Sequence, residues 1–401
     1  ELEKARGNER KLKALLLRLQ NIRVFDPACG SGNFLIIAYK ELRKFEMEVI
    51  DALNATGAQS VMYYSGIRLS QFFGIEIDDF AHELAILSLW LAEHQMNTAF
   101  KSKFGYAEAA LPLSDSGNII CTNSLRADWE KFCPFVNNKG LSYEVYICGN
   151  PPFVGSGRER TSEQNEDLSF VFQGFRSFKD LDLVAGWFWK GAKYINNSNA
   201  ELALVSTSSI CQGEQVSLLW PKILELGLHI NLAYQSFKWE NSAKDNAAVH
   251  VVIIGLSANP AVKKLFKLVG GEWHPKLVSN ISPYLHEGSN TISLPRRKPL
   301  SCVAAFANGS IAADGGHLIL NAHEREHLIE IEPESQKWIR EYQGAEDVLS
   351  GRTRYCLWLV DCTKEQLQTM PEVDARVERV RQTRLASAKL QTQRKAETAH
   401  L

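Results

Sequence analysis

One short segment combines residue types that suit chemistry on a flat, aminated heterocycle. Gly149-Asn150-Pro151-Pro152-Phe153 follows an apolar stretch over residues 143–148, which we interpret as a buried strand. The two prolines end ladder hydrogen bonding and fix the backbone just beyond that strand. The Asn150 carboxamide and the Pro151 carbonyl are then two rigid acceptors beside an aromatic ring. Such a turn suits the exocyclic –NH2 of a base that has flipped out of a helix.

The same segment also has a simpler interpretation. Two prolines and a phenylalanine after a strand can be a strand-terminating turn with a buried ring, and motifs this short occur by chance. The choice between the two therefore depends on what the rest of the chain places beside this turn.

A glycine-containing turn near the start of the chain predicts a ligand cradle. A short strand ends at Asp26, the turn Pro27-Ala28-Cys29-Gly30-Ser31-Gly32 follows, and a helical pattern continues to about residue 54. Glycine lets the backbone approach a ligand closely, and a helix start offers free N–H groups. The spacing matches neither the dinucleotide nor the P-loop fingerprint, and the turn contains no lysine, so a ligand without phosphate fits better.

Polar residues also end the next two predicted strands. Glu76 and Asp78 close the strand over residues 71–78, where a strand-end acid is placed to hold a ribose. We expect Glu76 to bind ribose hydroxyls and Asp78 to cap the following helix or lie beside the ligand; the simpler alternative is that both acids only cap the helix. Asn123, at the end of the strand over 118–125, is placed to contact a heterocycle. Asp128 fits a ligand contact or a solvated loop equally well.

The remaining pattern predicts a mostly parallel sheet with helices between its strands. Further strands are expected over residues 203–207, 229–234 and 248–255, the last two with little between them. The polar stretch over 155–167 is expected to be a loop beside the site, in which Arg158 and Arg160 would meet phosphates or only water. An aromatic loop is expected over 237–241.

The alternating strand and helix pattern ends at about residue 290. A basic, proline-flanked linker over 295–299 precedes a mixed stretch, a probable strand over 352–360 and a basic helix over the last thirty residues. Arginines at helical spacing suit a nucleic-acid face, and a solvated helix is the simpler alternative.

Composition limits the class of protein. The 401 residues are 45% hydrophobic and 23% charged, with a net charge of −1, which is ordinary for a globular protein and neither indicates nor excludes nucleic acid. No apolar run is long enough to span a bilayer. The eight cysteines form no C-x-x-C pair or metal-ligand cluster, so we expect reduced thiols, no metal and a cytoplasmic location. Because the chain starts at Glu1, we expect a fragment or processed form.

The order of these motifs resembles that of class I S-adenosylmethionine-dependent DNA methyltransferases acting on adenine amino groups, in the gamma subgroup. Three further stretches are similar to the MmeI-like, type IIL restriction–modification family: Gly74–Asp78 with Leu89–Asn97, Asp314–Leu320 and Arg354–Leu359. The resemblance implies an α/β, Rossmann-like domain over residues 1–290, with a mostly parallel seven-stranded sheet and an antiparallel edge. It also implies a smaller α+β target-recognition domain over 291–401, which we expect to be incomplete.

The resemblance further implies S-adenosylmethionine as cofactor and assigns roles residue by residue. The implied catalytic residues are Asn150, Pro151, Pro152 and Phe153. The implied cofactor-binding residues are Asp26, Pro27, Ala28, Gly30, Gly32, Asn33, Phe34, Glu76, Ile77, Asp78, Asn123, Leu125 and Asn150. In the implied mechanism the target adenine flips out, Asn150 and the Pro151 carbonyl bind its amino group, and Phe153 stacks on its ring.

Double-stranded DNA is the implied partner, and in this family a nuclease domain precedes the methyltransferase on one polypeptide. This chain shows no D…E-x-K nuclease constellation, so we expect methylation without cleavage. Two alternatives remain open. Asn-Pro-Pro-aromatic turns also serve RNA and protein-glutamine methylation, and a DNA-binding specificity module would need no catalysis. The identity of the methylated product distinguishes RNA or protein methylation from DNA methylation. The intact residues 150–153 argue against a DNA-binding module without catalysis.

Overall fold

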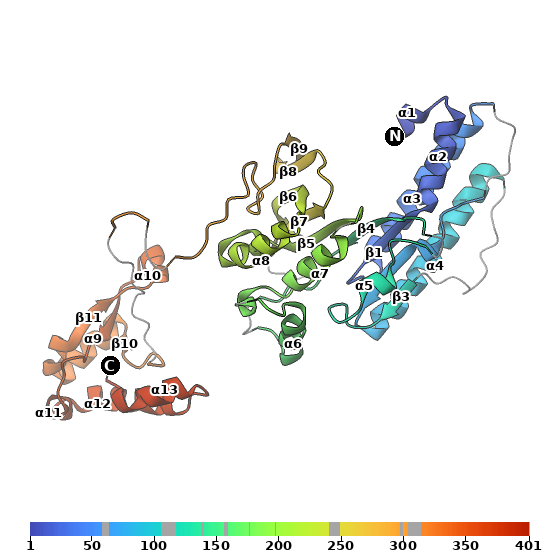
Figure 1. Ribbon diagram of the computed structural model, residues 1–401. Helices are drawn as coiled ribbons and strands as arrows, with labels where there is room; N and C mark the ends of the chain where they lie inside the picture. Colours follow the sequence, from blue (N-terminus) through green and yellow to red (C-terminus); the bar gives the residue numbers. More distant parts are fainter. Residues whose placement is uncertain are drawn as a thin grey trace. The chain divides into compact units, whose positions relative to one another are not determined.

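The computed structural model describes residues 1–57, 64–105, 118–137, 140–155, 159–175, 177–196, 198–239, 249–296, 300–303 and 314–400. The chain divides into two compact units, Glu1–Arg297 and Lys298–Leu401 (Figure 1). Each unit is described by itself below.

The first unit alternates strands and helices for most of its length. Its helices are α1 (Leu2–Ala5), α2 (Glu9–Gln20), α3 (Asn33–Asn54), α4 (Asp79–Phe104), α5 (Trp129–Phe132), α6 (Ser162–Val171), α7 (Ala185–Ile195) and α8 (Gly213–Glu225). Its strands are β1 (Ile22–Asp26), β2 (Phe72–Glu76), β3 (Asn118–Cys121), β4 (Glu144–Gly149), β5 (Glu201–Thr207), β6 (His229–Trp239), β7 (Val249–Ser257), β8 (Lys263–Val269) and β9 (Glu272–Val278).

These strands form one sheet in the order β3-β2-β1-β4-β5-β7-β6-β8-β9. The first five in this order run parallel, and β7 runs antiparallel to both β5 and β6. The predicted Rossmann-like class with a mostly parallel sheet is confirmed. The described part of the sheet has nine strands rather than seven, because β8 and β9 continue it beyond β6.

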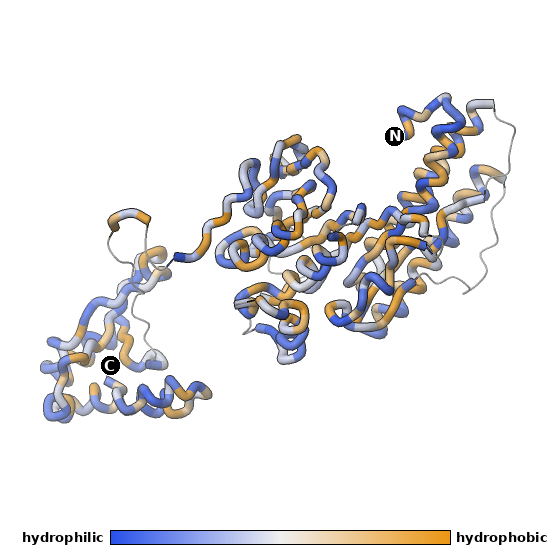
Figure 2. The backbone as a smooth tube through the Cα atoms, in the orientation of Figure 1, coloured by the Kyte–Doolittle hydropathy of each residue, from blue (hydrophilic) through white to orange (hydrophobic). Residues whose placement is uncertain are grey.

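Strands β1 and β2 are buried on both faces, which explains why they read as continuous apolar runs. Neighbouring residues of β1 belong to hydrophobic clusters on opposite faces of the sheet. Phe25 belongs to the cluster that includes residues of α5, α6, α7 and α8, whereas Val24 belongs to the one that includes residues of α3 and α4. In Figure 2 hydrophobic and hydrophilic stretches alternate along the helices. The result is a three-layer arrangement with helices on both sides.

Local sequence accounts for the helices that carry the site. In α3 the residues Leu35, Tyr39, Ile50 and Leu53 recur at helical spacing, and all are buried. Helix α6 starts with a capping box in which Thr161 and Gln164 bond to each other's backbone N–H. Part of the loop predicted over 155–167 is therefore helical.

The strand prediction around residue 237 needs a similar correction. Phe237, Lys238 and Trp239, predicted to lie in an aromatic loop, are the last residues of β6. They pair with Val251, His250 and Val249 beyond an irregularity in the β6–β7 register. The strand continues because a bulge keeps its aromatic side chains packed; Phe237 contacts Trp239 and Trp273.

The second unit is smaller and mixes helices with a short antiparallel sheet. Its elements are β10 (Ile319–Leu320), α9 (Ala322–Ile331), β11 (Ile339–Tyr342), α10 (Ala345–Ser350), β12 (Arg354–Leu357), α11 (Lys364–Gln368), α12 (Pro371–Leu385) and α13 (Leu390–Arg394). The strands lie in the order β10-β12-β11. Its own core includes Leu320, Leu328, Leu357, Val373 and Val380. The predicted strand is present as β12, and the single helix predicted over the last thirty residues is instead divided into α12, α13 and a short 3-10 turn.

Two further observations bear on the class of protein. All eight cysteines are free. Among the described helices, none combines the length and the apolar character that crossing a membrane requires.

Candidate active site

The predicted site residues gather at one edge of the sheet. The paired strands β3, β2, β1 and β4 run parallel, so their carboxyl ends meet at the same edge. Asp26 and Glu76 are the last residues of β1 and β2, and Asn150 follows β4 directly. In open α/β sheets, ligands bind outside these strand ends.

The glycine turn after β1 is held by backbone bonds to the neighbouring strand. Cys29 N–H donates to the Ile75 carbonyl at 3.1 Å, and Gly32 N–H donates to the Cys29 carbonyl at 2.8 Å. Gly30 and Gly32 have φ angles of 51° and 83°, a region that suits glycine. A Cβ on Gly32 would also lie 3.2 Å from the Ala85 Cβ, so this glycine lets α3 and α4 approach.

The next residues of the predicted cradle begin α3. Asn33 and Phe34 are its first two residues and are exposed, whereas Pro27 is buried. The Pro27 carbonyl accepts a hydrogen bond from the Trp187 indole N–H at 3.2 Å. Trp187, which the sequence pattern did not single out, thus fixes the turn from α7.

Glu76 closes the cradle from β2. Its Oε2 accepts the Gly30 N–H at 2.8 Å, and its Oε1 accepts the N–H groups of Ile77 and Asp78, each at 2.9 Å. An ionised carboxylate offers about four acceptor positions, and three N–H donors therefore leave little capacity for a further donor. The geometry ties the two predicted strand-end motifs together, and ribose binding by Glu76 stays a prediction.

Ile77 and Asp78 lie where β2 turns into α4. Asp78 accepts the Ala81 N–H at 2.8 Å and caps α4, which is one of the two roles predicted for it. The Ile77 side chain is 67% exposed. A bare apolar side chain beside the strand ends suits one face of a flat ring, and this contact stays a prediction.

The polar end of the third strand is engaged within the protein. The Asn123 carboxamide donates to Asp167 Oδ2 at 2.7 Å and accepts the Leu125 N–H at 3.0 Å. Asp167 Oδ1 in turn accepts from Arg126 Nε at 2.6 Å. Asp167 comes from α6, so the helix that follows the Asn-Pro-Pro-Phe turn holds the predicted cofactor contact.

The residues after Asn123 have mainly structural contacts. The Leu125 side chain is 1% exposed and belongs to the core, so a ligand can meet only its backbone. The half-buried Lys190 ammonium donates to the Leu125 carbonyl at 2.9 Å and also to the Ala127 carbonyl, and its partial burial lowers its pKa to about 8. Asp128 caps α5, and the Lys131 N–H that it accepts lowers its pKa. The cap is a further role beside the two that were left open for Asp128, and a ligand contact stays a prediction.

Asp26 is a strongly perturbed carboxyl group at this edge. It is fully buried, and burial raises its pKa to about 7, with the charge of Glu76 raising it further against the Ala28 N–H, which lowers it. Its Oδ1 accepts that N–H at 3.0 Å, while its Oδ2 has no partner among the described residues. A buried carboxylate oxygen without a donor is costly unless a ligand supplies one.

The turn after β4 lies directly against Asp26. A Cβ on Gly149 would lie 2.5 Å from Asp26 Oδ1, so glycine is needed for the two strand ends to approach. The Asn150 side chain is exposed, and within the described ranges it has no hydrogen-bond partner. Pro151 is buried, Pro152 is exposed, and Phe153 is half-buried against the core.

Beyond Phe153 the structure differs from the predicted loop contacts. Arg160, considered for phosphate binding, is 7% exposed and donates to the carbonyls of Leu181 and Lys179. Its guanidinium therefore has a structural role. Arg158 lies outside the described residues.

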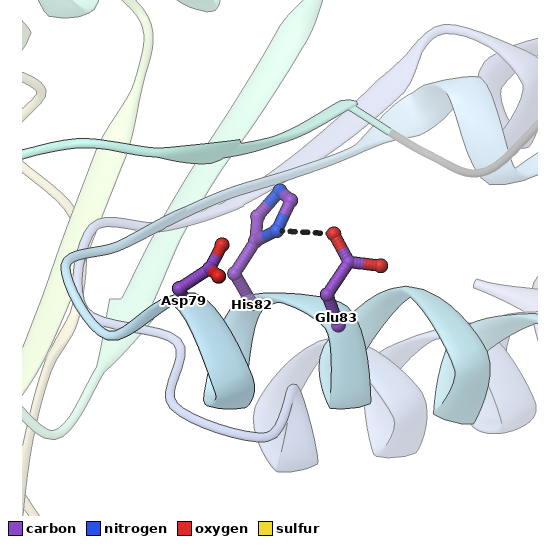
Figure 3. Close-up of side chains that lie close together, drawn as sticks. All are labelled: Asp79, His82 and Glu83. Atoms are coloured by element: carbon purple, nitrogen blue, oxygen red, sulfur yellow. Dashed lines mark hydrogen bonds and ion pairs between the residues drawn. The ribbon is translucent and has the colours of Figure 1, made fainter.

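A small acidic cluster lies on the first turn of α4. Figure 3 shows the His82 ring turned toward Glu83, with Asp79 beside it. His82 Nδ1 lies 3.1 Å from Glu83 Oε1, and its Nε2 lies 3.4 Å from the Ile119 carbonyl. Protein oxygens thus lie within hydrogen-bonding distance of both ring nitrogens, and the cluster gives no independent reason to assign a metal.

Family models match both units of the chain. Residues 2–267 match the DNA-methyltransferase domain of MmeI, and residues 287–401 match the MmeI target recognition domain. This chain belongs to the MmeI family. The predicted resemblance is confirmed, and it covers both units.

Two relatives illustrate the extent of the MmeI-family similarity. A Bacillus subtilis (strain 168) protein named DNA methyltransferase A is 43% identical over 368 residues, which are 92% of this chain and 41% of that protein. The structure of the type IIL restriction–modification enzyme MmeI in complex with DNA is 39% identical, with a TM-score of 0.89, over 99% of this chain and 53% of that one. The chain thus spans about half or less of the length of these MmeI-family relatives.

The basic helix of the MmeI-type recognition unit uses many of its arginines internally. Arg379 pairs with Glu372, and Arg381 pairs with Glu378. Arg384 is 4% exposed and donates to two backbone carbonyls near the chain end. The predicted nucleic-acid face is therefore not a row of unengaged cations along α12.

Proposed function

We propose that this chain transfers a methyl group from S-adenosylmethionine to the exocyclic amino group of an adenine flipped out of double-stranded DNA, within a restriction–modification system. The observation that carries the proposal is Asn150. Its exposed carboxamide has no partner among the described residues and follows β4 directly, beside the half-buried Phe153. Membership of the MmeI family supports DNA as the substrate.

The residues at the sheet edge fit S-adenosylmethionine. The unpartnered, buried Oδ2 of Asp26 suits the cationic amino group of the methionine part. Gly30 and Gly32 leave the backbone bare beside it, and the start of α3 adds N–H groups. When bound, the cofactor supplies an electrophilic methyl group on a sulfonium.

The proposed binding role of the remaining residues follows from their placement. Ile77, whose side chain is 67% exposed, would cover one face of the cofactor adenine beside Asp78 and Asn123. Glu76 would hold the ribose while also fixing the Gly30 N–H. This set offers acidic and amide acceptors with one apolar face and contains no lysine or arginine, as expected for a cofactor without phosphate.

At the target, the chain's own groups orient the acceptor nitrogen. The Asn150 carboxamide oxygen and the Pro151 carbonyl each accept a hydrogen bond from one N–H of the adenine amino group, which localises the lone pair on that nitrogen. Phe153 stacks on the flipped base and replaces the neighbouring bases that stacked on it in the duplex. Orientation and electrostatics at fixed acceptors then lower the barrier without a strong base.

The proposal extends to organisation and partners. Residues 1–290 form the methyltransferase domain and 291–401 form part of a target-recognition domain, with double-stranded DNA as partner and a cytoplasmic location. A nuclease domain on a longer polypeptide is part of the proposal for the native protein. The two relatives, of which this chain spans 41% and 53%, leave room for one.

Modification-sensitive sequencing tests the reaction and finds its target together. The chain is expressed in a host without adenine methylases, alongside Asn150→Ala and the control Asn54→Ala. Asn54 is exposed at the opposite end of α3 from the glycine turn. We expect N6-methyladenine at one short motif with the unchanged chain and with Asn54→Ala, and none with Asn150→Ala.

The other outcomes discriminate between alternatives. Methylation that survives Asn150→Ala would refute the proposed catalytic turn. Unmethylated DNA, together with methylated RNA or methylated protein glutamine in the same cells, would show that the substrate is RNA or protein rather than DNA.

A further inference from the structure

Asp182 is a buried acid outside the predicted site that contacts the chain directly after the catalytic turn. We propose that Asp182 is the positioning residue of the Asn150–Phe153 turn and holds it in the orientation that a flipped base requires. The inference rests on the proposed methyl transfer. Asp182 is 4% exposed and lies three residues before Ala185, the first residue of α7.

The first tie joins Asp182 and the next residue, Leu183, to the two backbone groups of Val154. Asp182 Oδ1 accepts the Val154 N–H at 3.1 Å, and the Val154 carbonyl accepts the Leu183 N–H at 3.0 Å. The same Oδ1 also accepts the Val184 N–H at 3.3 Å. With both of its peptide groups bonded, the residue after Phe153 has little freedom to rotate.

The second tie joins Asp182 to the elements that follow β5. Its backbone N–H donates to Gln215 Oε1 at 3.2 Å, and its Oδ2 lies 3.4 Å from the Thr207 hydroxyl, which donates. Thr207 ends β5 and Gln215 lies in the first turn of α8. Asp182 therefore connects the catalytic turn to the next strand of the sheet and its helix.

The turn itself explains why such a support is needed. Pro151 and Pro152 have no N–H, so two consecutive residues offer no backbone donor for anchoring. Anchoring then falls to the flanks, where Gly149 belongs to β4 and Val154 bonds to Asp182. On the far side of the same loop, Arg160 donates to the Lys179 carbonyl at 2.6 Å and to the Leu181 carbonyl. The segment after the Asn150–Phe153 turn is thus bonded to residues 179–182 at two points, Val154 and Arg160.

A positioning role makes a specific distinction between substitutions. Asp182→Asn keeps an Oδ1 acceptor for the two N–H groups, and its amide can donate to the Thr207 hydroxyl. Asp182→Ala removes the acceptor altogether. Asp180→Ala, at an exposed acid two residues earlier, loses the same charge without touching the turn.

The test measures methyl transfer and cofactor binding separately on the whole chain. Single-turnover transfer of tritiated methyl from S-adenosylmethionine is followed on a duplex carrying the motif found by sequencing, and S-adenosylmethionine binding is titrated by calorimetry. We expect Asp182→Ala to slow transfer by roughly ten- to a hundred-fold, as displacement of a bound base by about 1 Å would. Its cofactor dissociation constant should stay within about two-fold, and Asp182→Asn and Asp180→Ala should stay near the unchanged rate.

Several results would overturn the proposal. They are an unchanged transfer rate in Asp182→Ala, equal losses in Asp182→Asn and Asp182→Ala, or a parallel loss of cofactor binding, which would indicate general destabilisation. If Asp182→Ala does not fold, Gln215→Leu replaces it and should give the same split at a smaller fold-change; no change there would also refute the role. If the unchanged chain methylates nothing, the proposed function fails, and the role of Asp182 is tested by hydrogen exchange at the Val154 amide instead. If that amide exchanges no faster in Asp182→Ala than in the unchanged chain, the proposed bond from Val154 to Asp182 is refuted.

Discussion

Gly149→Ala is the substitution whose effect can be worked out most directly from the structure. A Cβ at residue 149 would lie 2.5 Å from Asp26 Oδ1 and 3.3 Å from Asp26 Cγ. Asp26 has no room to retreat, because it is fully buried and its Oδ1 already accepts the Ala28 N–H. Relief of the overlap therefore requires the end of β4 or the glycine turn to shift.

The magnitude follows from the cost of overpacking. One extra carbon in a site that cannot relax costs roughly 1–3 kcal/mol of the free energy of unfolding. For a domain of this size, about 2 °C of melting temperature is lost per kcal/mol. We therefore expect the melting temperature of the first unit to fall by roughly 2–6 °C. Cofactor affinity should fall with it, because the same shift moves Asp26.

The control is Gly155→Ala, six residues further along the chain. A Cβ there would also meet a carboxylate oxygen, that of Glu159. Glu159 is exposed, however, and its flexible side chain can turn into solvent at little cost. Differential scanning calorimetry of both variants, with titration of S-adenosylmethionine, separates the two cases. Equal melting temperatures for Gly149→Ala and the unchanged chain would refute the packing argument, and so would an equal fall in Gly155→Ala.

Two further predictions concern the buried charges. Because burial raises the pKa of Asp26 to about 7, the folded protein holds this proton at pH values where the unfolded chain has released it, so stability should fall as pH rises from about 4 to 7. Asp26→Asn should reduce that fall, measured by urea unfolding at pH 5 and pH 8; an unchanged pH difference would contradict the assignment. Arg384→Ala should destabilise the second unit by about 1–3 kcal/mol, because the carbonyls of Lys395 and Thr398 lose their donor, whereas the exposed Arg381→Ala should change stability by less than about 0.5 kcal/mol. Limited proteolysis of the second unit at increasing temperature compares the two variants, and equal resistance would refute the structural role of Arg384.

The sequence predicted the fold well where local pattern determines structure. Apolar runs buried on both faces fixed the parallel strands, and their polar ends indicated Asp26, Glu76 and Asn150 before any contact was known. Strand order is harder to read, because β8 and β9 carry mixed polar and apolar residues. Lys263, Lys264 and Lys267 fall within β8, and this composition is typical of an exposed extension rather than of a core strand.

The sequence could not show which side chains support the site. Asp182 and Asp167 are separated from Val154 and Asn123 by 28 and 44 residues. Such pairs depend on how helices return to the sheet, and no spacing rule predicts them. Arg160 shows the same limit in reverse: its position in a polar loop suggested phosphate binding, while burial and two carbonyl partners give it a structural role.

Asp26 connects the two motifs in a way that neither motif shows alone. The cofactor turn places its carboxylate in a fully buried position, and the catalytic motif begins with a glycine because any side chain there would overlap that carboxylate. One oxygen is bonded to the turn itself, and the other lacks a partner among the described residues. A ligand with a positive group at this oxygen would lower the pKa of Asp26 and favour its ionised form. Binding should therefore strengthen the hydrogen bond from the Ala28 N–H to Asp26, beside the end of β4 that the proposed substrate contact Asn150 follows.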